Sequence, residues 1–536
     1  MSQAEIARRS TRGSFALFAG NLATTVVSFV AITLIARLLG PSQYGVYALA
    51  ILVPNILLNF LGFGMNSGIT RYAALHLSQG RPDLARRMTM NGVAFVVLSG
   101  VVLSAVSAAG ASLLSGFVLH RPDIASSVRL ASLLIFGQAV FQAAISALLG
   151  WSRMGEISAT NVLQSLLRFA IAVPLIVLGF AVTGALLGNV LSVILGGLVG
   201  LAVLVRRMAA GDGGVRLRPL EGFSEDVRSM LSYGATLFVG QFAANVSTQF
   251  VVVVLAAFAS DATVGFYQSA NNFVTAITLT SGAMSQALFP AFAHLDGVRG
   301  DLRRAFAYAA KYTAFVLTPI VFLLMGASVQ IIGVPLGPSY RVASGYLVIL
   351  AFSNVPFFLG HGVLQSFFNG VGRPRLYTAF SVAAAVVLVG LAPILAIGAG
   401  LGVPGLVAAI LASNLTSVVA GLYLASRYFH ARTDLSAALS ILAASILAFL
   451  SVLPIDLWGP VRAYALAAEV AVFAAVYLTA APLLRAVGPD DLDVLDSAVS
   501  GLGRFRAVVT PLLAYERFVL RRTRRASLRS DGRTDD

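Results

Sequence analysis

The chain has 536 residues, of which 58% are hydrophobic and only 11% are charged. Soluble domains average about 25% charged residues, so this composition excludes an ordinary soluble fold. The absence of cysteine excludes a disulfide framework and a thiolate metal site, and the five histidines lack ligand spacing, so no metal is expected. A net charge of +15 would suggest a nucleic-acid partner for a soluble protein. In a chain this apolar, excess arginine is more typical of the cytoplasmic side of a membrane, and no nucleic-acid partner is expected.

The amino-terminal segment is basic, with Arg8, Arg9 and Arg12 preceding the first apolar run. That run is about 25 residues long, enough to cross a hydrocarbon core of about 30 Å. It ends at Arg37 rather than at a small-residue cleavage site. These features predict a retained first transmembrane helix rather than a cleaved signal peptide.

Apolar stretches of membrane-spanning length recur along the rest of the chain. They predict an all-α, polytopic membrane protein with about fourteen transmembrane helices. The predicted spans are residues 14–38, 44–68, 89–115, 127–149, 157–179, 184–205, 231–258, 264–292, 308–332, 343–368, 376–397, 402–426, 435–454 and 464–484.

The distribution of basic residues between the loops supports this topology. With the amino terminus inside, 31 of the 37 arginine and lysine residues fall on the inner side and five fall outside. The remaining one, Arg168, lies within a predicted span. Adding or omitting one helix would destroy the asymmetry, so we predict that both termini are cytoplasmic.

Two segments of the chain resemble each other and indicate an internal repeat. Gly45 and Tyr47 match Gly265 and Tyr267, and in both places a long helix and a basic inner loop follow. Both copies have the same orientation, which predicts two parallel lobes. The predicted parts are an N-lobe of six helices at 1–205, a cytoplasmic linker at 206–230, a C-lobe of six helices at 231–426, two more helices at 427–485 and a cytoplasmic basic tail at 486–536.

The tail at 486–536 begins acidic and ends rich in arginine. A basic surface helix of this kind suits binding to anionic lipid headgroups. The alternative, after Ala526, is a solvated tail.

The sequence offers little for catalysis, because the predicted outer loops are short and an intramembrane enzyme needs carboxylates or a metal near the interface. Glu469 is the only carboxylate well inside a predicted span. We expect an interhelical hydrogen bond to hold Glu469, and proton coupling is the alternative. The chain is therefore not expected to be an enzyme.

Neutral polar residues at helical spacing lie within the predicted spans of both lobes. Amides suit a hydroxyl-rich ligand, because each offers a donor and an acceptor without the desolvation cost of a charge. The alternative is that they bond across helices and hold the bundle together. The substrate-binding candidates of this kind are Asn21, Asn55, Asn59, Asn161, Gln164, Gln241, Asn245, Gln249, Gln268, Asn272, His361 and Gln365.

Arg168 lies near the middle of the predicted fifth helix, on the face that also carries Asn161 and Gln164. An unpaired cation at this depth is costly, and no carboxylate in a neighbouring span is an evident partner. Arginine binds phosphate oxygens through two parallel hydrogen bonds, so we predict a phosphate-binding role. Pairing with backbone carbonyls or water is the alternative.

The opening of the chain, from Arg12 through ARLLGPSQYGVYALA to Arg71 in GMNSGITRYAALHLSQG, resembles a known family. It is similar to the polysaccharide transporter branch of the multidrug/oligosaccharidyl-lipid/polysaccharide exporter (MOP) superfamily. The resemblance covers about the first 90 residues. It implies two six-helix lobes that form a V around a cationic cavity. Arg12, Arg37 and Arg71 match basic positions of that pattern and join Arg168 as substrate-binding candidates.

The resemblance also implies a function, because the branch includes O-antigen and other lipid-linked oligosaccharide flippases. We expect this chain to move a polyprenyl or dolichyl (pyro)phosphate-linked oligosaccharide across a prokaryotic cytoplasmic membrane, as a monomer. A lipid II flippase and a drug or metabolite exporter of the same superfamily are the alternatives. The drug-efflux branch typically has a carboxylate in the first lobe's cavity, and the first helix here has none. No cofactor is expected, and ion coupling stays open because few charged residues line the second lobe.

Overall fold

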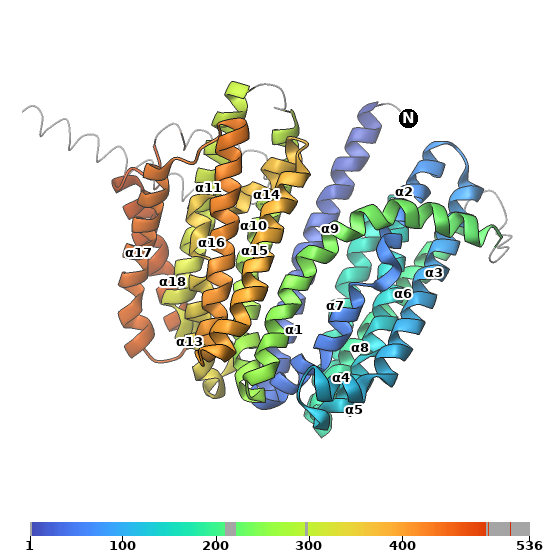
Figure 1. Ribbon diagram of the computed structural model, residues 1–536, viewed down its shortest axis with the longest axis horizontal. Helices are drawn as coiled ribbons and strands as arrows, with labels where there is room; N and C mark the ends of the chain where they lie inside the picture. The colour runs from blue at the N-terminus through green and yellow to red at the C-terminus, as the bar shows by residue number, and fades with distance from the viewer. Residues whose placement is uncertain (1–2, 210–220, 295–298, 489–490, 492–514, 516–536) are drawn as a thin grey trace, which may run out of the picture. The chain divides into compact units, whose positions relative to one another are not determined.

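The computed structural model describes residues 3–209, 221–294, 299–488, 491 and 515, without the side chains of residues 3–19 and 239–248 and of a few scattered positions. The elements of this part are helical and form two compact units, Met1–Gln268 (unit 1) and Ser269–Asp536 (unit 2) (Figure 1). Within the same residues, ten segments are long and apolar enough to cross a membrane. This confirms an all-α polytopic membrane protein, and the count of fourteen spans stays a prediction.

Unit 1 contains the first seven predicted spans and the start of the eighth. Figure 1 shows α3, α6, α7 and α8 running side by side; α3 contacts α6, and both α6 and α7 contact α8. The start of α9 packs on α2 and α3, so α9 belongs to this unit. The elements are α1 (Gln3–Leu58), η1 (Leu61–Gly64), α2 (Met65–Ser78), α3 (Pro82–Ala109), α4 (Ala111–Phe117), η2 (Pro122–Ile124), α5 (Ala125–Ala131), α6 (Leu133–Gly150), α7 (Met154–Leu175), η3 (Ile176–Phe180), α8 (Ala181–Ala209), α9 (Phe223–Phe258) and the start of α10 (Asp261–His294).

Unit 2 begins within α10 and includes the two C-terminal helices, which pack on each other and on α11. The lobe boundaries predicted around 206–230 stay a prediction. The further elements are α11 (Arg299–Gly326), α12 (Ser328–Leu336), η4 (Pro338–Tyr340), α13 (Arg341–Phe352), η5 (Val355–Leu359), α14 (His361–Gly370), α15 (Pro374–Pro393), η6 (Ile394–Gly398), α16 (Gly402–Phe429), α17 (Leu435–Trp458) and α18 (Ala463–Leu483).

Glycines in the left-handed region divide the two longest helical runs at predicted span boundaries. Gly40 has φ 72° and separates the predicted first and second spans within α1. Gly179 has φ 94° and separates α7 from α8, which then pack against each other. Only glycine adopts this conformation without strain, so these positions end one span and start the next.

Two predicted spans contain interruptions of several residues, and three others, 89–115, 127–149 and 308–332, are interrupted at a single residue, Gly110, Ser132 and Ala327. The span at 44–68 is interrupted, because α1 ends at Leu58 and α2 starts at Met65. The span at 343–368 is broken into α13, η5 and α14, and α14 starts after Gly360 with φ 87°. The sequence is apolar through both breaks, so hydropathy alone does not reveal them. Irregular backbone at membrane depth is tolerated where protein buries it or where it lines a cavity.

The internal repeat predicted from the sequence has a direct structural counterpart in unit 1. A Cβ atom on Gly45 would overlap the carbonyl oxygen of Asp261, and one on Gly265 would overlap that of Pro41. The two matching glycines thus lie at a reciprocal crossing of α1 and α10, where the backbones touch. Small residues allow such close helix contacts in membranes.

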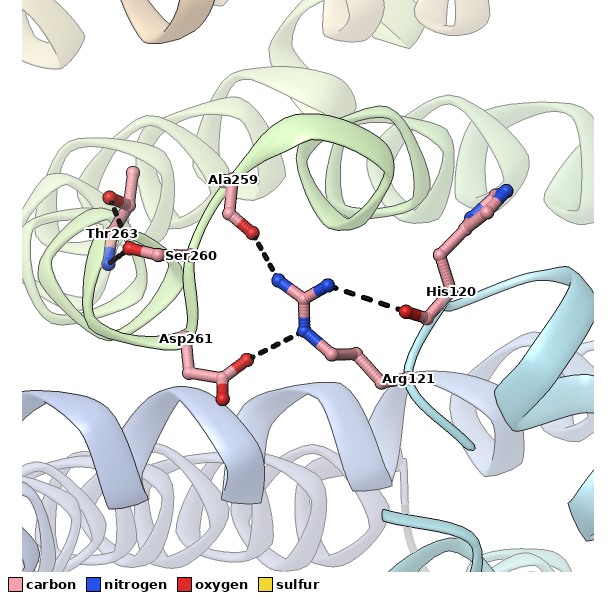
Figure 2. Close-up of polar contacts among 6 residues, drawn as sticks. All are labelled: His120, Arg121, Ala259, Ser260, Asp261 and Thr263. Atoms are coloured by element: carbon pink, nitrogen blue, oxygen red, sulfur yellow. Dashed lines mark hydrogen bonds and ion pairs between the residues drawn. The ribbon is translucent and has the colours of Figure 1, made fainter. Parts of the chain in front are cut away.

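An arginine holds the turn between α9 and α10, as Figure 2 shows. Arg121 donates from Nε to Asp261 Oδ1 at 3.1 Å and from Nη2 to the Ala259 carbonyl at 2.7 Å. Its Nη1 also donates to the His120 carbonyl at 3.3 Å. We call this set the Arg121 clamp. It lies beside the glycine crossing, because Asp261 takes part in both.

Ion pairs join segments that the topology predicts on one side of the membrane. Arg121 and Asp261 both belong to predicted outer loops. On the predicted inner side of unit 1, Arg87 binds Asp226 at 3.0 Å and Arg207 binds Glu156 at 3.1 Å. The contacts agree with the predicted alternation of loops, while the assignment of inside and outside stays a prediction.

Replacing either crossing glycine by alanine is expected to destabilise the fold strongly, because the new Cβ atom would meet backbone atoms that cannot move aside. Gly45→Ala and Gly265→Ala should each lower the melting temperature and the monodisperse yield in detergent. Gly390→Ala in α15 is the control, since its Cβ atom would meet no heavy atom within 4 Å. Alanine favours a helix over glycine by up to about 1 kcal/mol, so this control should melt no lower than wild type. Wild-type stability of Gly45→Ala would contradict the crossing.

Loss of the Arg121 clamp is expected to loosen the α9–α10 turn. The chain has no cysteine, so Ala262→Cys gives a single label site in that turn. Adding Arg121→Ala should speed maleimide labelling about tenfold or more, because hydrogen bonds from a charged group contribute about 1.5–3 kcal/mol each. Arg129→Ala, which removes a neighbouring exposed arginine with one 3.5 Å contact to Ser112 Oγ, is the control. Equal labelling in both backgrounds would refute the clamp.

Candidate functional site

A polar cluster lies inside unit 1 where α1, α7 and α8 meet. Asn189 Nδ2 donates to the Tyr47 hydroxyl at 3.2 Å, and Tyr47 is only 3% exposed. Gln164 Nε2 donates to Ser192 Oγ at 3.1 Å. Arg168 lies close enough to Tyr47 for an electrostatic interaction between them. We call these five residues the Arg168 cluster.

Arg168 carries the only charge of this cluster. Its Nε atom is buried and has no hydrogen-bond partner within the described residues. Among the ion pairs of those same residues, none involves Arg168. The buried acceptor atom Asn189 Oδ1 is also without a partner there. The cluster therefore contains a cation whose charge no described carboxylate compensates.

The other predicted arginines lie elsewhere in unit 1. Arg71 is exposed on α2, and its guanidinium stacks over the Tyr233 ring of α9 at 4.1 Å. Arg37 is exposed on α1, near the break at Gly40. The structure thus does not bring Arg37 and Arg71 into the Arg168 cluster.

The predicted amides divide into several groups. Gln164 bonds to Ser192, and Asn59 Nδ2 donates to the carbonyls of Asn55 and Ile56, so the structural alternative accounts for these two. Asn21 is exposed, and the half-buried ones are Asn55, Asn161, Gln249, Gln268 and Asn272. Of these, Gln268 has a buried Oε1 atom without a partner in the described part of the chain. The side chains of Arg12, Gln241 and Asn245 lie outside the described residues.

Unit 2 contains a cavity of about 260 Å³ between α10, α14, α15 and α16, here called the α14 cavity. It brings together the predicted residues His361 and Gln365. His361 Nε2 lies 3.2 Å from Ser417 Oγ, and the His361 ring packs on Phe357 at 5.2 Å between centroids. The remaining lining residues are Thr278, Ser281, Gly282, Ser285, Gly362, Leu364, Tyr377 and Phe380.

The break before α14 builds this cavity. Gly360 takes φ 87° at the start of α14, so the chain turns there and His361 becomes the first helical residue. A Cβ on Gly362 would lie 2.8 Å from Ser281 Oγ, so this glycine lets α14 approach α10 closely. Discontinuous helices commonly form the substrate sites of membrane transporters.

Several lining residues were not among the sequence candidates. Ser281 and Ser285 lie one turn apart on α10, and Ser417 comes from α16. Helical spacing of hydroxyls was a usable signal for the first two. It is a weak one, because membrane-embedded Ser and Thr often bond to their own helix, as Thr280 does to the Ala276 carbonyl. The sequence did not indicate that Tyr377 lines a cavity, since an aromatic residue in a span is usually packed against apolar neighbours.

The chemistry of the α14 cavity is neutral and polar, with aromatic walls. Its lining offers hydroxyl, amide and imidazole groups, which donate and accept hydrogen bonds. Tyr377, Phe380 and Phe357 offer apolar faces for ring contact. No lining residue is a carboxylate, so the cavity suits an uncharged hydroxyl-rich group better than a cation.

Two curated proteins from prokaryotes are similar to this chain. Agl15 of Haloferax volcanii, described as a probable low-salt glycan biosynthesis flippase, is 24% identical over 366 residues, which cover 68% of this chain and 71% of Agl15. The succinoglycan biosynthesis transport protein ExoT of Rhizobium meliloti is 23% identical over 332 residues. That match covers 61% of this chain and 62% of ExoT, less than two thirds of it.

Solved structures of transport proteins share the fold of this chain. The lipid II flippase MurJ in an inward closed conformation matches with a TM-score of 0.70 at 13% identity, over 87% of this chain and 98% of that one. An inward-facing multidrug resistance MATE family transporter matches with a TM-score of 0.65 at 17% identity, over 76% and 94%. At such identities the likeness shows the fold alone.

The family itself follows from the sequence match. Residues 10–296 match the family described as polysaccharide biosynthesis protein, and this range is more than half of the 536 residues. The match includes α1, the Arg168 cluster and the glycine crossing. The chain therefore belongs to the polysaccharide biosynthesis protein family, with the fold of MOP-superfamily transporters.

Proposed function

We propose that this chain is a flippase that moves a polyprenyl or dolichyl (pyro)phosphate-linked oligosaccharide across the cytoplasmic membrane, for cell-surface polysaccharide or glycan biosynthesis. The observation that carries the proposal is the pair of sites described above. One holds an uncompensated cation, Arg168, and the other is a neutral, hydroxyl-lined cavity around α14. A lipid-linked glycan contains the two matching groups, an anionic phosphate and an uncharged sugar.

Arg168 suits the phosphate. A guanidinium binds two phosphate oxygens at once, and the interaction strengthens where water is excluded. The buried Nε of Arg168 has no partner among the described residues, so it is available for such a bond. Tyr47, which accepts a hydrogen bond from Asn189, is close enough to interact electrostatically with Arg168.

The α14 cavity suits one sugar residue of the glycan. Its volume of about 260 Å³ is at the small end of ligand sites. Gln365 is exposed to the cavity and free to bond a sugar hydroxyl, while His361, one turn earlier on α14, is held by its contact with Ser417. Neutral donors and acceptors bind hydroxyls without the desolvation cost of a charge.

Alternating access is the mechanism that we propose, since multidrug resistance MATE family transporters with this fold have been solved in inward-facing and outward-facing conformations. In this scheme the protein is a monomer in a prokaryotic cytoplasmic membrane with both termini inside. The basic tail at 486–536 binds anionic headgroups, no nucleic acid takes part, and no chemical step is catalysed.

A lipid II flippase would need the same chemistry, because lipid II is also a polyprenyl pyrophosphate glycan. Drug or metabolite export is the third candidate. It is disfavoured by the lack of a carboxylate in the α14 cavity lining and by the positive charge of the Arg168 cluster. Transport assays with these three substrate classes distinguish the candidates.

Arg168→Ala is expected to slow flipping about tenfold or more, because a hydrogen bond to a charged group contributes about 1.5–3 kcal/mol. The assay uses liposomes with a fluorescent polyprenyl pyrophosphate oligosaccharide in both leaflets and an outside quencher. Arg168→Lys keeps the charge but not the two parallel hydrogen bonds, so its rate should be intermediate. Arg129→Ala at an exposed site is the control. If Arg168→Ala equals wild type, Arg168 is structural; if wild type equals empty liposomes, the flippase proposal is wrong.

Gln365→Leu is expected to slow movement of the glycan-bearing lipid and to leave movement of the bare polyprenyl phosphate unchanged. The change removes a hydrogen-bonding group from the cavity, which only the sugar would occupy. Asn369→Leu is the matched control, because Asn369 is an amide on the same helix that does not line the cavity. The measurement is the ratio of the two rates in one liposome preparation. An equal loss for both lipids would assign Gln365 to something other than sugar binding.

A further inference from the structure

Two buried carboxylates lie on the C-terminal helix pair, outside both sites described above. Asp456 is near the end of α17 and is 2% exposed, and Glu469 is in α18 and is 0% exposed. The two helices pack along each other, and α12 contacts both. Asp456 and Glu469 interact electrostatically, so they share one region of unit 2. Their surroundings nevertheless differ completely.

Asp456 is held by donors from the start of α12. Its carboxylate accepts from the backbone N–H of Val329 at 3.0 Å and of Gln330 at 3.1 Å, and from Ser328 Oγ at 3.4 Å. The turn after α17 binds the same helix, because Gln330 donates to the Pro460 carbonyl and accepts from the Arg462 N–H. A helix N-terminus favours negative charge, so these contacts stabilise an ionised Asp456.

Glu469 has none of these donors. Neither carboxyl oxygen has a hydrogen-bond partner within the described residues, although both atoms are buried. Glu469 lies between Ala465 and Phe473 on the face of α18 that packs into unit 2, so it does not point to lipid. The interhelical hydrogen bond expected from the sequence is absent in this part of the chain, and that expectation is wrong.

The helices around Glu469 supply no counter-charge in the part of the chain that is described. α17 contributes Asp456, and α12 contains no titratable residue. The last cation of α11 is Lys311. Lys311 is itself paired with Asp491 at 2.6 Å.

The titratable groups of α18 and of the turn before it are engaged elsewhere. The Arg462 guanidinium lies over the Tyr464 ring at 5.8 Å. The Tyr477 hydroxyl donates to the Phe315 carbonyl of α11 at 2.8 Å. Neither offers a bond to Glu469, which is therefore the one fully buried carboxyl of the described residues for which they provide no donor.

We propose that Glu469 is a proton-binding site, occupied in this conformation. Burying an ionised carboxylate without a partner is far more costly than burying the neutral acid, so the side chain takes up a proton from solution as the helices close around it. The proton leaves when α17 and α18 separate enough to admit water. Coupling of this step to glycan movement rests on the proposed function, and it would let a proton gradient drive that movement.

Infrared spectroscopy of the full chain in liposomes of ether-linked phosphatidylcholine, which has no ester carbonyl, tests the site directly, because a protonated carboxyl has its own C=O stretching band. Near neutral pH, wild type should show a band that Glu469→Gln lacks. Asp456→Asn is the matched control and should keep the band but melt at a lower temperature, since it loses the negative charge that the start of α12 favours. Glu469→Gln has nearly the same shape as the neutral acid, so it should melt like wild type. Identical wild-type and Glu469→Gln spectra, or loss of the band in Asp456→Asn, would overturn the site.

The same liposomes test the coupling. A pH gradient should accelerate movement of the fluorescent lipid-linked glycan by wild type, while for Glu469→Gln the ratio of rates with and without the gradient should fall to about one. Equal acceleration of both proteins would overturn the coupling. If wild type moves no glycan lipid but the band depends on Glu469, the proposed function fails and the proton site stands.

Discussion

Hydrocarbon offers no hydrogen-bond partner, so each polar group in a membrane span must find one inside the protein or face a water-filled space. In this chain the constraint sorts the polar residues of the spans into two sets. Gln164 and Asn59 find partners on helices and are explained by structure alone. Arg168 Nε has no partner among the described residues, and Gln365 is exposed in the α14 cavity. We propose that a substrate bonds with the polar groups that the protein itself leaves unsatisfied.

The same constraint limits where a membrane helix can break. A break frees backbone groups, which is tolerated only where protein or a cavity receives them. The break before α14 lies at a cavity, whereas the one at Gly179 forms a turn between packed helices. Breaks of the kind seen at Gly179 occur in both copies of the repeat. α7 and α15 both end near a proline, Pro174 or Pro393, before a short irregular segment.

Sequence patterns predicted the features that depend on many residues or on symmetry. The arginine distribution placed Arg87 and Asp226 on one side, and the structure brings them together. The repeat was predicted from two Gly–Tyr pairs and from the long helix and basic loop that follow each of them. The crossing explains the two glycines, because it tolerates no side chain. The break at Gly360 was missed, since glycine and apolar residues also occur within continuous spans. The partners of Glu469 were mispredicted because hydrogen bonding across helices depends on side-chain positions that hydropathy does not encode.

The two copies of the repeat share the glycine crossing but differ in the charged residues of their helices. Gly45 and Gly265 must both remain small, because each fits against the other's helix. Arg168 in α7 is not constrained by this contact and has no counterpart in the other copy. The corresponding helix of the second copy, α15, has no arginine after Arg375. A phosphate-linked glycan is itself asymmetric, with charge at one end and hydroxyls at the other. A symmetric scaffold with one cationic and one neutral site matches such a substrate, whereas two equal sites would suit only one of its parts.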